Sequence, residues 1–153
     1  MSVLSVAILS STSDDRFRLC AEIRRVVFQV GQGVSEAREV DGLDDQCIHL
    51  LAECDGTPCG TARYYVKGAW AKVERVAVLG AYRGKSVGRS LMSAIEAHAR
   101  SVGCIGVMLS SQEEVIPFYE ALHYRVVGDL FFDADIPHRN MRKPFQVRSG
   151  TQG

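Results

Sequence analysis

The sequence has no surplus of charge of either sign, because its 18 basic and 18 acidic side chains cancel to a formal net charge of zero. This balance excludes the broad positive field that gathers nucleic acid or anionic membrane, so neither is expected as a partner. No apolar run reaches the roughly 18 residues that a membrane span needs, and residues 1–10 lack the positive segment of a secretory signal. We therefore expect a soluble, cytoplasmic protein.

Close cysteine pairs are also scarce, which argues against a zinc site and against a disulfide scaffold. The chain has five cysteines, an odd number, and they are spread along it: Cys20, Cys47, Cys54, Cys59 and Cys104. Cys54 and Cys59 flank a turn, but one pair without a second is poor evidence for a metal. We expect reduced thiols and no bound metal.

The chain does contain enough apolar material for a core, since 46% of its 153 residues are hydrophobic. This length and composition are typical of one domain, which we place at residues 1–148, followed by a disordered tail at residues 149–153. Neither internal repeats nor low-complexity segments suggest any other organisation.

Hydrophobic periodicity predicts a mixed α/β sheet covered by helices. Apolar and β-branched runs predict strands at residues 3–9, 48–54, 61–66, 72–79, 106–109, 124–132 and about 139–147. Three- and four-residue steps predict three helices: one ending near residue 28, one from Gly84 to Gly103, and one at residues 113–122. The second, third and fourth strands should form an antiparallel meander, and the polar residues 31–46 an exposed connection.

The loop at residues 80–89, just before the clearest helix, suits an anion. The first turn of a helix has backbone N–H groups without partners, and the helix dipole adds partial positive charge there. Arg83, Lys85 and Arg89 add full charges, while Gly84 and Gly88 let a phosphate approach the backbone. A pyrophosphate fits this description. The alternative is a glycine-containing turn before an amphipathic helix with solvated basic residues.

A nucleotide-hydrolysing P-loop is a weaker candidate for the same residues. Gly84-Lys85-Ser86 matches the end of that signature, but its first glycine should stand at Leu79 and stands instead at Gly80. The loop is one residue short, and no later strand offers a clear acidic end for magnesium.

Two segments together resemble the GNAT N-acetyltransferases. Val76-Ala77-Val78 followed by Arg83-Gly84-Lys85-Ser86-Val87-Gly88 is similar to the acetyl-coenzyme A signature of that family, Arg/Gln-x-x-Gly-x-Gly/Ala. Phe118-Tyr119-Glu120-Ala121-Leu122-His123-Tyr124 is similar to its later Phe-Tyr-Glu-x-Leu-Gly-Phe segment. Ser86 and His123 each stand where the family usually has glycine.

Further segments resemble the ElaA-like branch of this superfamily: residues 27–32, Glu39-x-Asp41, residues 49–52 and Ile136-Pro137-His138-x-x-Met141. Gly31 replaces the glutamate that this branch usually places before Gln32. The matches cover nearly the whole chain in the expected order. They imply the GNAT fold, a mixed central sheet of about seven strands flanked by about four helices, with the strands on either side of the main helix splayed to admit the pantetheine arm.

The resemblance implies direct transfer of an acetyl group from acetyl-coenzyme A to a primary amine of a small molecule or peptide, without a covalent enzyme intermediate. A free backbone N–H near Val76 is expected to stabilise the oxyanion. The residues expected to bind the cofactor are Val76, Ala77, Val78, Arg83, Gly84, Lys85, Ser86, Val87, Gly88, Arg89 and Gln112. The alternative is a catalytically weak module that binds acyl-coenzyme A as a sensor, and both monomer and homodimer stay open.

Three side chains have expected roles in the reaction, each with an alternative. Tyr119 matches the family's tyrosine acid, which protonates the departing thiolate; the alternative is an ordinary half-buried tyrosine. Glu74 is the best local base for the incoming ammonium; the alternatives are a solvated glutamate and a chain of waters. His138 either lines the acceptor pocket or is a histidine held in a hairpin by hydrogen bonds.

Two expectations concern the surroundings of these side chains. Period-two alternation places Glu74 on the same face of its strand as Lys72, Val76 and Val78. Acidic residues are frequent at 31–46 and 133–135, where they either attract a cationic amine or are simply solvated.

Overall fold

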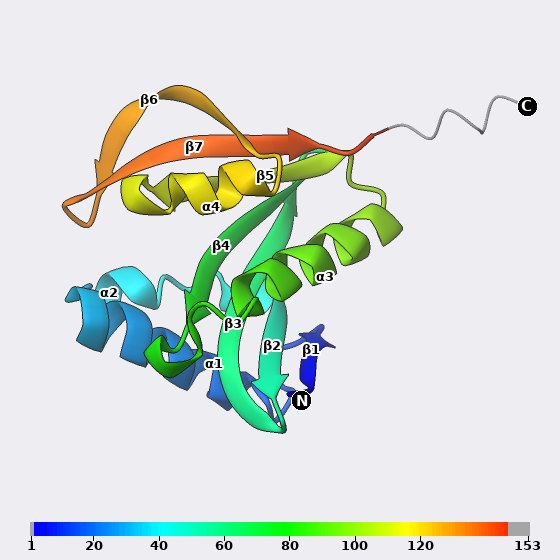
Figure 1. Cartoon of the computed structure of the whole chain (residues 1–153), viewed down its shortest axis with the longest axis vertical. Coiled ribbons are helices and arrows are strands. Elements are labelled where there is room, and N and C mark those ends of the chain that lie inside the picture. Colours follow the sequence, from blue (N-terminus) through cyan, green and yellow to red (C-terminus); the bar gives the residue numbers. More distant parts are fainter. Residues whose placement is uncertain (1, 147–153) are drawn as a thin grey trace, which may run out of the picture.

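A seven-stranded mixed sheet forms the centre of the computed structural model, which describes residues 2–146 (Figure 1). In spatial order its strands are β1 (Leu4–Leu9), β2 (Ile48–Cys54), β3 (Thr57–Lys67), β4 (Trp70–Val78), β5 (Gly106–Gln112), β7 (Ile136–Pro144) and β6 (Arg125–Asp133). Neighbouring strands are antiparallel except β4 and β5, which run parallel. The predicted mixed sheet and its meander are confirmed. The predicted tail at residues 149–153 and residue 147 of the last predicted strand lie outside the described residues.

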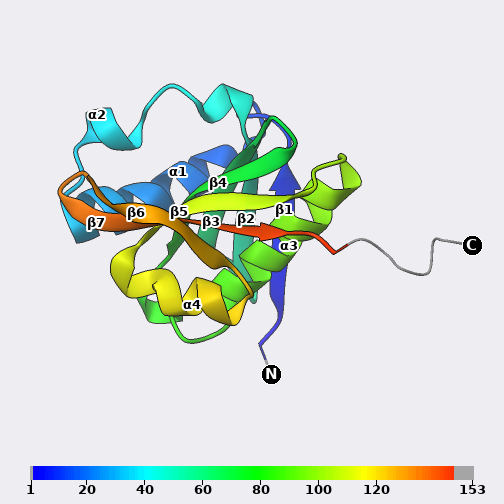
Figure 2. The ribbon, with the colours of Figure 1, turned by 90° about the horizontal axis from the view of Figure 1, so that it is seen from above.

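Helices cover both faces of this sheet (Figure 2). The helix α1 (Phe17–Arg24), which continues as the π-helical η1 (Arg25–Val30), lies with α2 (Glu36–Glu39) on one face, and α3 (Val87–Ser101) and α4 (Ile116–Ala121) lie on the other. Short 3-10 turns, η2 (Asp44–Gln46), η3 (Gly80–Tyr82) and η4 (Glu113–Val115), precede β2, α3 and α4. No helix within residues 2–146 has both the length and the apolarity needed to cross a membrane.

The helix α3 covers the larger of two apolar cores, and its sequence explains why it forms. Val87, Leu91, Ile95 and Ala99 recur at every fourth position, so they share one face of the helix, and all four are buried. The helix ends as predicted because Gly103 adopts a φ of 94°, which a side chain would oppose. A smaller core lies beneath α1.

A β-bulge in β4 reverses the side-chain alternation of that strand. Two residues of β4, Arg75 and Val76, oppose a single residue of β3, and Arg75 has a left-handed φ of 57°. Val76 and Val78 therefore pack toward the α3 core, as Val73 does. The prediction that Glu74 shares a face with Val76 and Val78 is wrong, because period-two alternation does not allow for a bulge.

The strands β4 and β5 separate in the middle of the sheet. Their parallel pairing runs from Trp70 opposite Gly106 to Val73 opposite Leu109 and stops there. Within the described chain, β4 beyond this point pairs with β3 and β5 pairs with β7. In Figure 1, β4 curves away from β5 toward α1. This separation is the splay that the family resemblance implies.

Residues 31–46 form a mostly exposed connection, as the sequence predicts, but Glu39 within it is buried. Glu39 is only 3% exposed, and its carboxylate lies 2.6 Å from the guanidinium of Arg24, which is 2% exposed. Arg75 of the bulge also bonds to Glu39, at 3.2 Å. The arginines that pair with Glu39 lie 15 and 36 positions away along the chain. A local pattern therefore shows acidic residues but not their partners.

Glu39→Gln is expected to destabilise the protein by about 2 kcal/mol, because the buried guanidinium of Arg24 loses one of its two carboxylate partners and keeps only Asp44, at 2.7 Å. Glu22→Gln is the matched control, since Glu22 and Arg25 form an exposed ion pair whose loss should cost less than about 1 kcal/mol. Denaturant unfolding of both variants measures the difference. Equal free energies of unfolding would show that the buried pair has no special role.

Candidate active site

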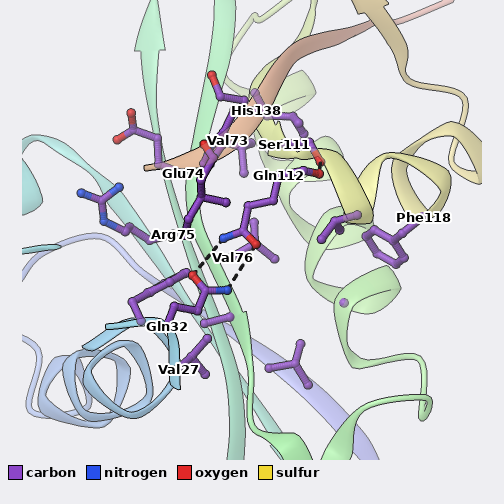
Figure 3. A pocket seen from close by; sticks show the side chains of 18 of the residues that line it. Val27, Gln32, Val73, Glu74, Arg75, Val76, Ser111, Gln112, Phe118 and His138 are labelled. Atoms are coloured by element: carbon purple, nitrogen blue, oxygen red, sulfur yellow. Dashed lines mark hydrogen bonds between the residues drawn. The ribbon is translucent and has the colours of Figure 1, made fainter. Parts of the chain in front are cut away.

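A cavity of about 1010 Å³ occupies the gap between β4 and β5 (Figure 3). Its walls come from η1, α2, β4, the loop before α3, the end of β5, α4 and the turn between β6 and β7. The predicted site residues that line it are Glu74, Val76, Ala77, Val78, Arg83, Gly84, Ser86, Val87, Gly88, Arg89, Gln112, Tyr119 and His138. Lys85 is the one predicted site residue that is not part of the wall.

The loop before α3 places two left-handed residues at the cavity wall. Gly84 has a φ of 77°, and Ser86, the N-cap of α3, has a φ of 67°. Glycine adopts this conformation freely, whereas it costs a serine about 1 kcal/mol. The side chain of Ser86 makes no capping hydrogen bond, so the first N–H groups of α3 lack that usual partner.

Positive charge gathers at this end of the cavity. Arg83 and Arg89 are both part of the wall beside the N-terminus of α3. Lys85 lies instead over the ring of Tyr82, with its Nζ 5.8 Å from the ring centroid. Two arginines, free N–H groups and the positive end of the helix dipole together favour an anion.

Gly88 also allows close packing between α3 and α4. A Cβ at this position would lie 3.1 Å from the ring of Phe118, closer than side chains normally approach. Because Phe118 belongs to α4, the absent side chain lets α4 approach the first turn of α3. A larger residue at position 88 would therefore push the Phe118 ring by a few tenths of an ångström.

Two glutamine side chains bridge the cavity (Figure 3). Gln32, just after η1, donates a hydrogen bond to Gln112 at 3.2 Å, and Gln112, at the end of β5, donates one back at 2.9 Å. A ligand that passes between the walls here has to exchange these bonds for its own. The sequence predicts a ligand role for Gln112 alone. In the sequence, Gln32 is noted only as part of the segment at residues 27–32 that resembles the ElaA-like branch. No local pattern connects it with Gln112, because 80 positions separate the two.

Tyr119 lies on α4 and is 6% exposed. Its ring makes edge-on contacts with Phe118 at 5.0 Å and Tyr124 at 5.7 Å, which fix its orientation. Burial raises the pKa of Tyr119 far above its ordinary value. The hydroxyl is therefore protonated at neutral pH, and its raised pKa makes it a weaker acid than an exposed tyrosine.

Glu74 belongs to a fixed cluster of charges. Its carboxylate accepts a hydrogen bond from Arg63 at 2.8 Å. Arg63 also binds Asp41 at 2.7 Å and Asp44 at 2.8 Å. Burial alone would raise the pKa of Asp41, but hydrogen bonds from Arg63 and from the backbone of Leu43 outweigh it and lower the pKa to about 2. Glu74 thus lines the cavity as part of an ion-pair cluster rather than as a freely solvated side chain.

His138 combines the two alternatives that its sequence position leaves open. It lines the cavity, and its Nδ1 lies 2.7 Å from the carbonyl oxygen of Ile136 within the β6–β7 hairpin. A carbonyl can only accept, so Nδ1 carries the hydrogen, and Nε2 of the neutral ring is the acceptor. The ring also stacks on Phe131 at 5.8 Å.

Among residues 2–146, no group of three or more side chains is arranged to hold a metal ion.

Lys72 is a lining residue that sequence reasoning missed as a ligand contact. It is half-buried on β4, and its Nζ lies 3.5 Å from the hydroxyl of Ser110. Burial lowers the pKa of this ammonium below its ordinary value. The available signal was its place two residues before Glu74, which puts both side chains on the same face of the strand.

The comparison to known proteins identifies the family that this fold belongs to. The family model described as "Acetyltransferase (GNAT) family" matches residues 17–124. The chain therefore belongs to the GNAT acetyltransferase family.

Individual proteins support this assignment. The uncharacterized N-acetyltransferase YjcF of Bacillus subtilis is 35% identical over 122 residues, which cover 79% of this chain and 87% of YjcF. The crystal structure of Escherichia coli ElaA matches with a TM-score of 0.80 and 25% identity over 92% of this chain and 99% of ElaA. An acyl-CoA N-acyltransferase from Pseudomonas aeruginosa matches with a TM-score of 0.77 and 29% identity over 92% of this chain and 99% of its own. The resemblance to the ElaA-like branch is confirmed.

Ser86→Gly and His123→Gly are each expected to raise the free energy of unfolding by about 0.5–1 kcal/mol. Both residues hold a positive φ, 67° and 75°, that glycine adopts without strain. Ser93→Gly is the control, because Ser93 is exposed within α3 and a glycine there should destabilise the helix by roughly 0.5 kcal/mol. Thermal or denaturant unfolding measures all three, and destabilisation by the first two would refute the strain at these positions.

Proposed function

We propose that the protein is an acetyl-coenzyme A dependent N-acetyltransferase that transfers the acetyl group directly to a primary amine of a small molecule or peptide. The observation that carries this proposal is one continuous cavity, lined at one end by the loop before α3 and at the other by Lys72, Glu74 and His138, with Tyr119 in its wall. Such a cavity accommodates both substrates at once, as direct attack requires.

The cofactor is proposed to enter from the loop before α3. Its pyrophosphate would accept hydrogen bonds from the first N–H groups of α3. The positive charges of Arg83 and Arg89 would offset the negative charge of the pyrophosphate. Its pantetheine arm would follow the part of β4 from Val76 to Val78, where pairing with β5 has ended. Gln112 faces the same space and would exchange its bond with Gln32 for one to the arm.

The chemical step needs three groups. The amine attacks the thioester carbon, and the developing oxyanion accepts a hydrogen bond from a backbone N–H near Val76, beside the bulge. The amine proton passes to Glu74, directly or through a water. The carbon–sulfur bond breaks, and Tyr119 gives its proton to the departing thiolate.

Coenzyme A and acetyl-coenzyme A are expected to raise the melting temperature by mass action, with about 2.7 kcal/mol of stabilisation at a hundredfold excess over Kd. ATP with magnesium should have little effect, and stabilisation by ATP alone would refute the cofactor assignment.

Ser86→Gly should bind coenzyme A more tightly than the wild type, because it removes a side chain from the mouth of the phosphate site. Ser93→Gly, at an exposed position of α3 outside the cavity wall, is the control and should leave binding unchanged. Weaker binding of coenzyme A by Ser86→Gly would mean that the hydroxyl of Ser86 donates a hydrogen bond to the phosphate.

Tyr119→Phe is expected to lower kcat about a hundredfold or more, because the thiolate loses its proton donor, while the affinity for coenzyme A stays nearly the same. The measurement is thiol release from acetyl-coenzyme A over a panel of amines. Tyr65→Phe, on β3 and outside the cavity wall, is the matched control. Unchanged turnover would remove Tyr119 from the acid role. Cofactor binding without thiol release from any amine would favour the sensor over the enzyme.

A further inference from the structure

Lys72 is an unpaired cation at the acceptor end of the cavity. None of the ion pairs among residues 2–146 includes it. The nearest polar contact of its Nζ is the hydroxyl of Ser110 at 3.5 Å, and that hydroxyl donates its own hydrogen to Asn140 at 2.7 Å. The ammonium is therefore half-buried with one weak hydrogen-bond partner, which is costly for a charged group.

The carboxylates around the acceptor end are, by contrast, already occupied by arginines. Glu39 binds Arg24 and Arg75, Asp41 binds Arg63 and Arg75, Glu74 binds Arg63, and Asp133 lies 3.7 Å from Arg38. None of these acidic side chains forms an ion pair with Lys72, although the charges of Glu74 and Asp133 partly offset the effect of burial on the pKa of its ammonium. Among residues 31–46, Glu39, Asp41 and Asp44 are thus paired with arginines and not simply solvated, whereas Asp133 is 64% exposed.

We propose that Lys72 binds an anionic group of the acceptor, so that the acceptor is a small amine that also carries a carboxylate or a phosphate. This inference rests on the proposed acetyl transfer and names the class of amine that the same cavity takes. Lysine is a common partner for both anions, and a hydrogen bond between two charged groups is among the strongest that proteins make.

The position of Lys72 also limits the size of the acceptor. Lys72 and Glu74 are two residues apart on one face of β4, before the bulge, so their attachment points are separated by about 7 Å. An amine that gives its proton toward Glu74 while its anionic group contacts Lys72 therefore has the two groups only a few bonds apart. The burial that lowers the pKa of Lys72 would be offset once an anion lies beside it.

Matched pairs of amines test the proposal in the thiol-release assay. β-Alanine is compared with ethylamine for the carboxylate, and phosphoethanolamine with ethanolamine for the phosphate. At least one anionic member should show a kcat/KM about ten- to a hundredfold above that of its neutral partner, the range that a charge-assisted hydrogen bond supplies. Whichever pair shows the larger ratio identifies the anion. Equal values within both pairs would overturn the proposal.

Variants assign the effect to Lys72. Lys72→Met keeps the length of the side chain and should raise KM for the anionic amine about ten- to a hundredfold, with kcat and the KM for acetyl-coenzyme A nearly unchanged. Lys72→Arg should restore most of the preference, because it restores the charge. Lys67→Met removes an exposed lysine outside the cavity whose charge reaches Lys72 only at long range, so it should change the KM far less than Lys72→Met does. An equal loss with the neutral and the anionic amine in Lys72→Met would overturn the proposal.

A binding measurement separates this proposal from the proposed function. Protein saturated with coenzyme A, which fills the phosphate site of the loop, is titrated with β-alanine and with phosphoethanolamine while the melting temperature is followed. A rise in wild type and Lys67→Met that is absent in Lys72→Met supports the anion site even if no amine releases thiol, in which case only the enzymatic assignment fails. No rise in wild type, or the same rise in Lys72→Met, would overturn the anion site.

Discussion

The bulge at Arg75 is the constraint on which the site depends. One extra residue in β4 turns Val76 and Val78 toward the α3 core and lies just beyond Val73, where pairing with β5 ends. A regular strand would continue its ladder with β5 and fill the gap that is now the cavity. The same change of direction leaves Glu74 on the opposite face, beside the ion-pair cluster. The cavity and the charges around its acceptor end therefore have a common origin in the backbone.

The ion-pair cluster stabilises the strained backbone conformation of Arg75 in the bulge. A left-handed arginine is unfavourable by about 1–2 kcal/mol, so the surrounding structure has to hold it there. The Arg75 side chain does this through bonds to the carboxylate of Glu39, to the carboxylate of Asp41 and to the backbone carbonyl of Arg38. Buried ion pairs contribute little net stability relative to apolar packing, but they tolerate few alternative geometries. Their main effect here is to bind residues 31–46 to β4 in one arrangement.

The sequence predicts those parts of the protein that depend on local periodicity. The helix α3 follows from its apolar residues at every fourth position, and its end follows from Gly103. The bulge does not follow, because a two-against-one register depends on the partner strand and leaves no mark in the period of β4. The pairs of Glu39 with Arg24 and of Gln32 with Gln112 do not follow either, since their members are distant in sequence. Local patterns thus predict which elements carry the site, but not which polar groups they bring together.

His123 shows how backbone strain far from the cofactor loop still bears on the site. Its φ of 75° lets the N–H of Tyr124 bond to the carbonyl of Tyr119 at 3.0 Å and lets its own N–H bond to Glu120 at 2.9 Å. These two bonds form the Schellman motif that ends α4, and they connect directly to the backbone of Tyr119. Most residues would resist this conformation, and the family usually has glycine there. The chain therefore accepts strain at both ends of its site, at Ser86 before α3 and at His123 after α4, and in both places the left-handed turn positions groups that face the cavity.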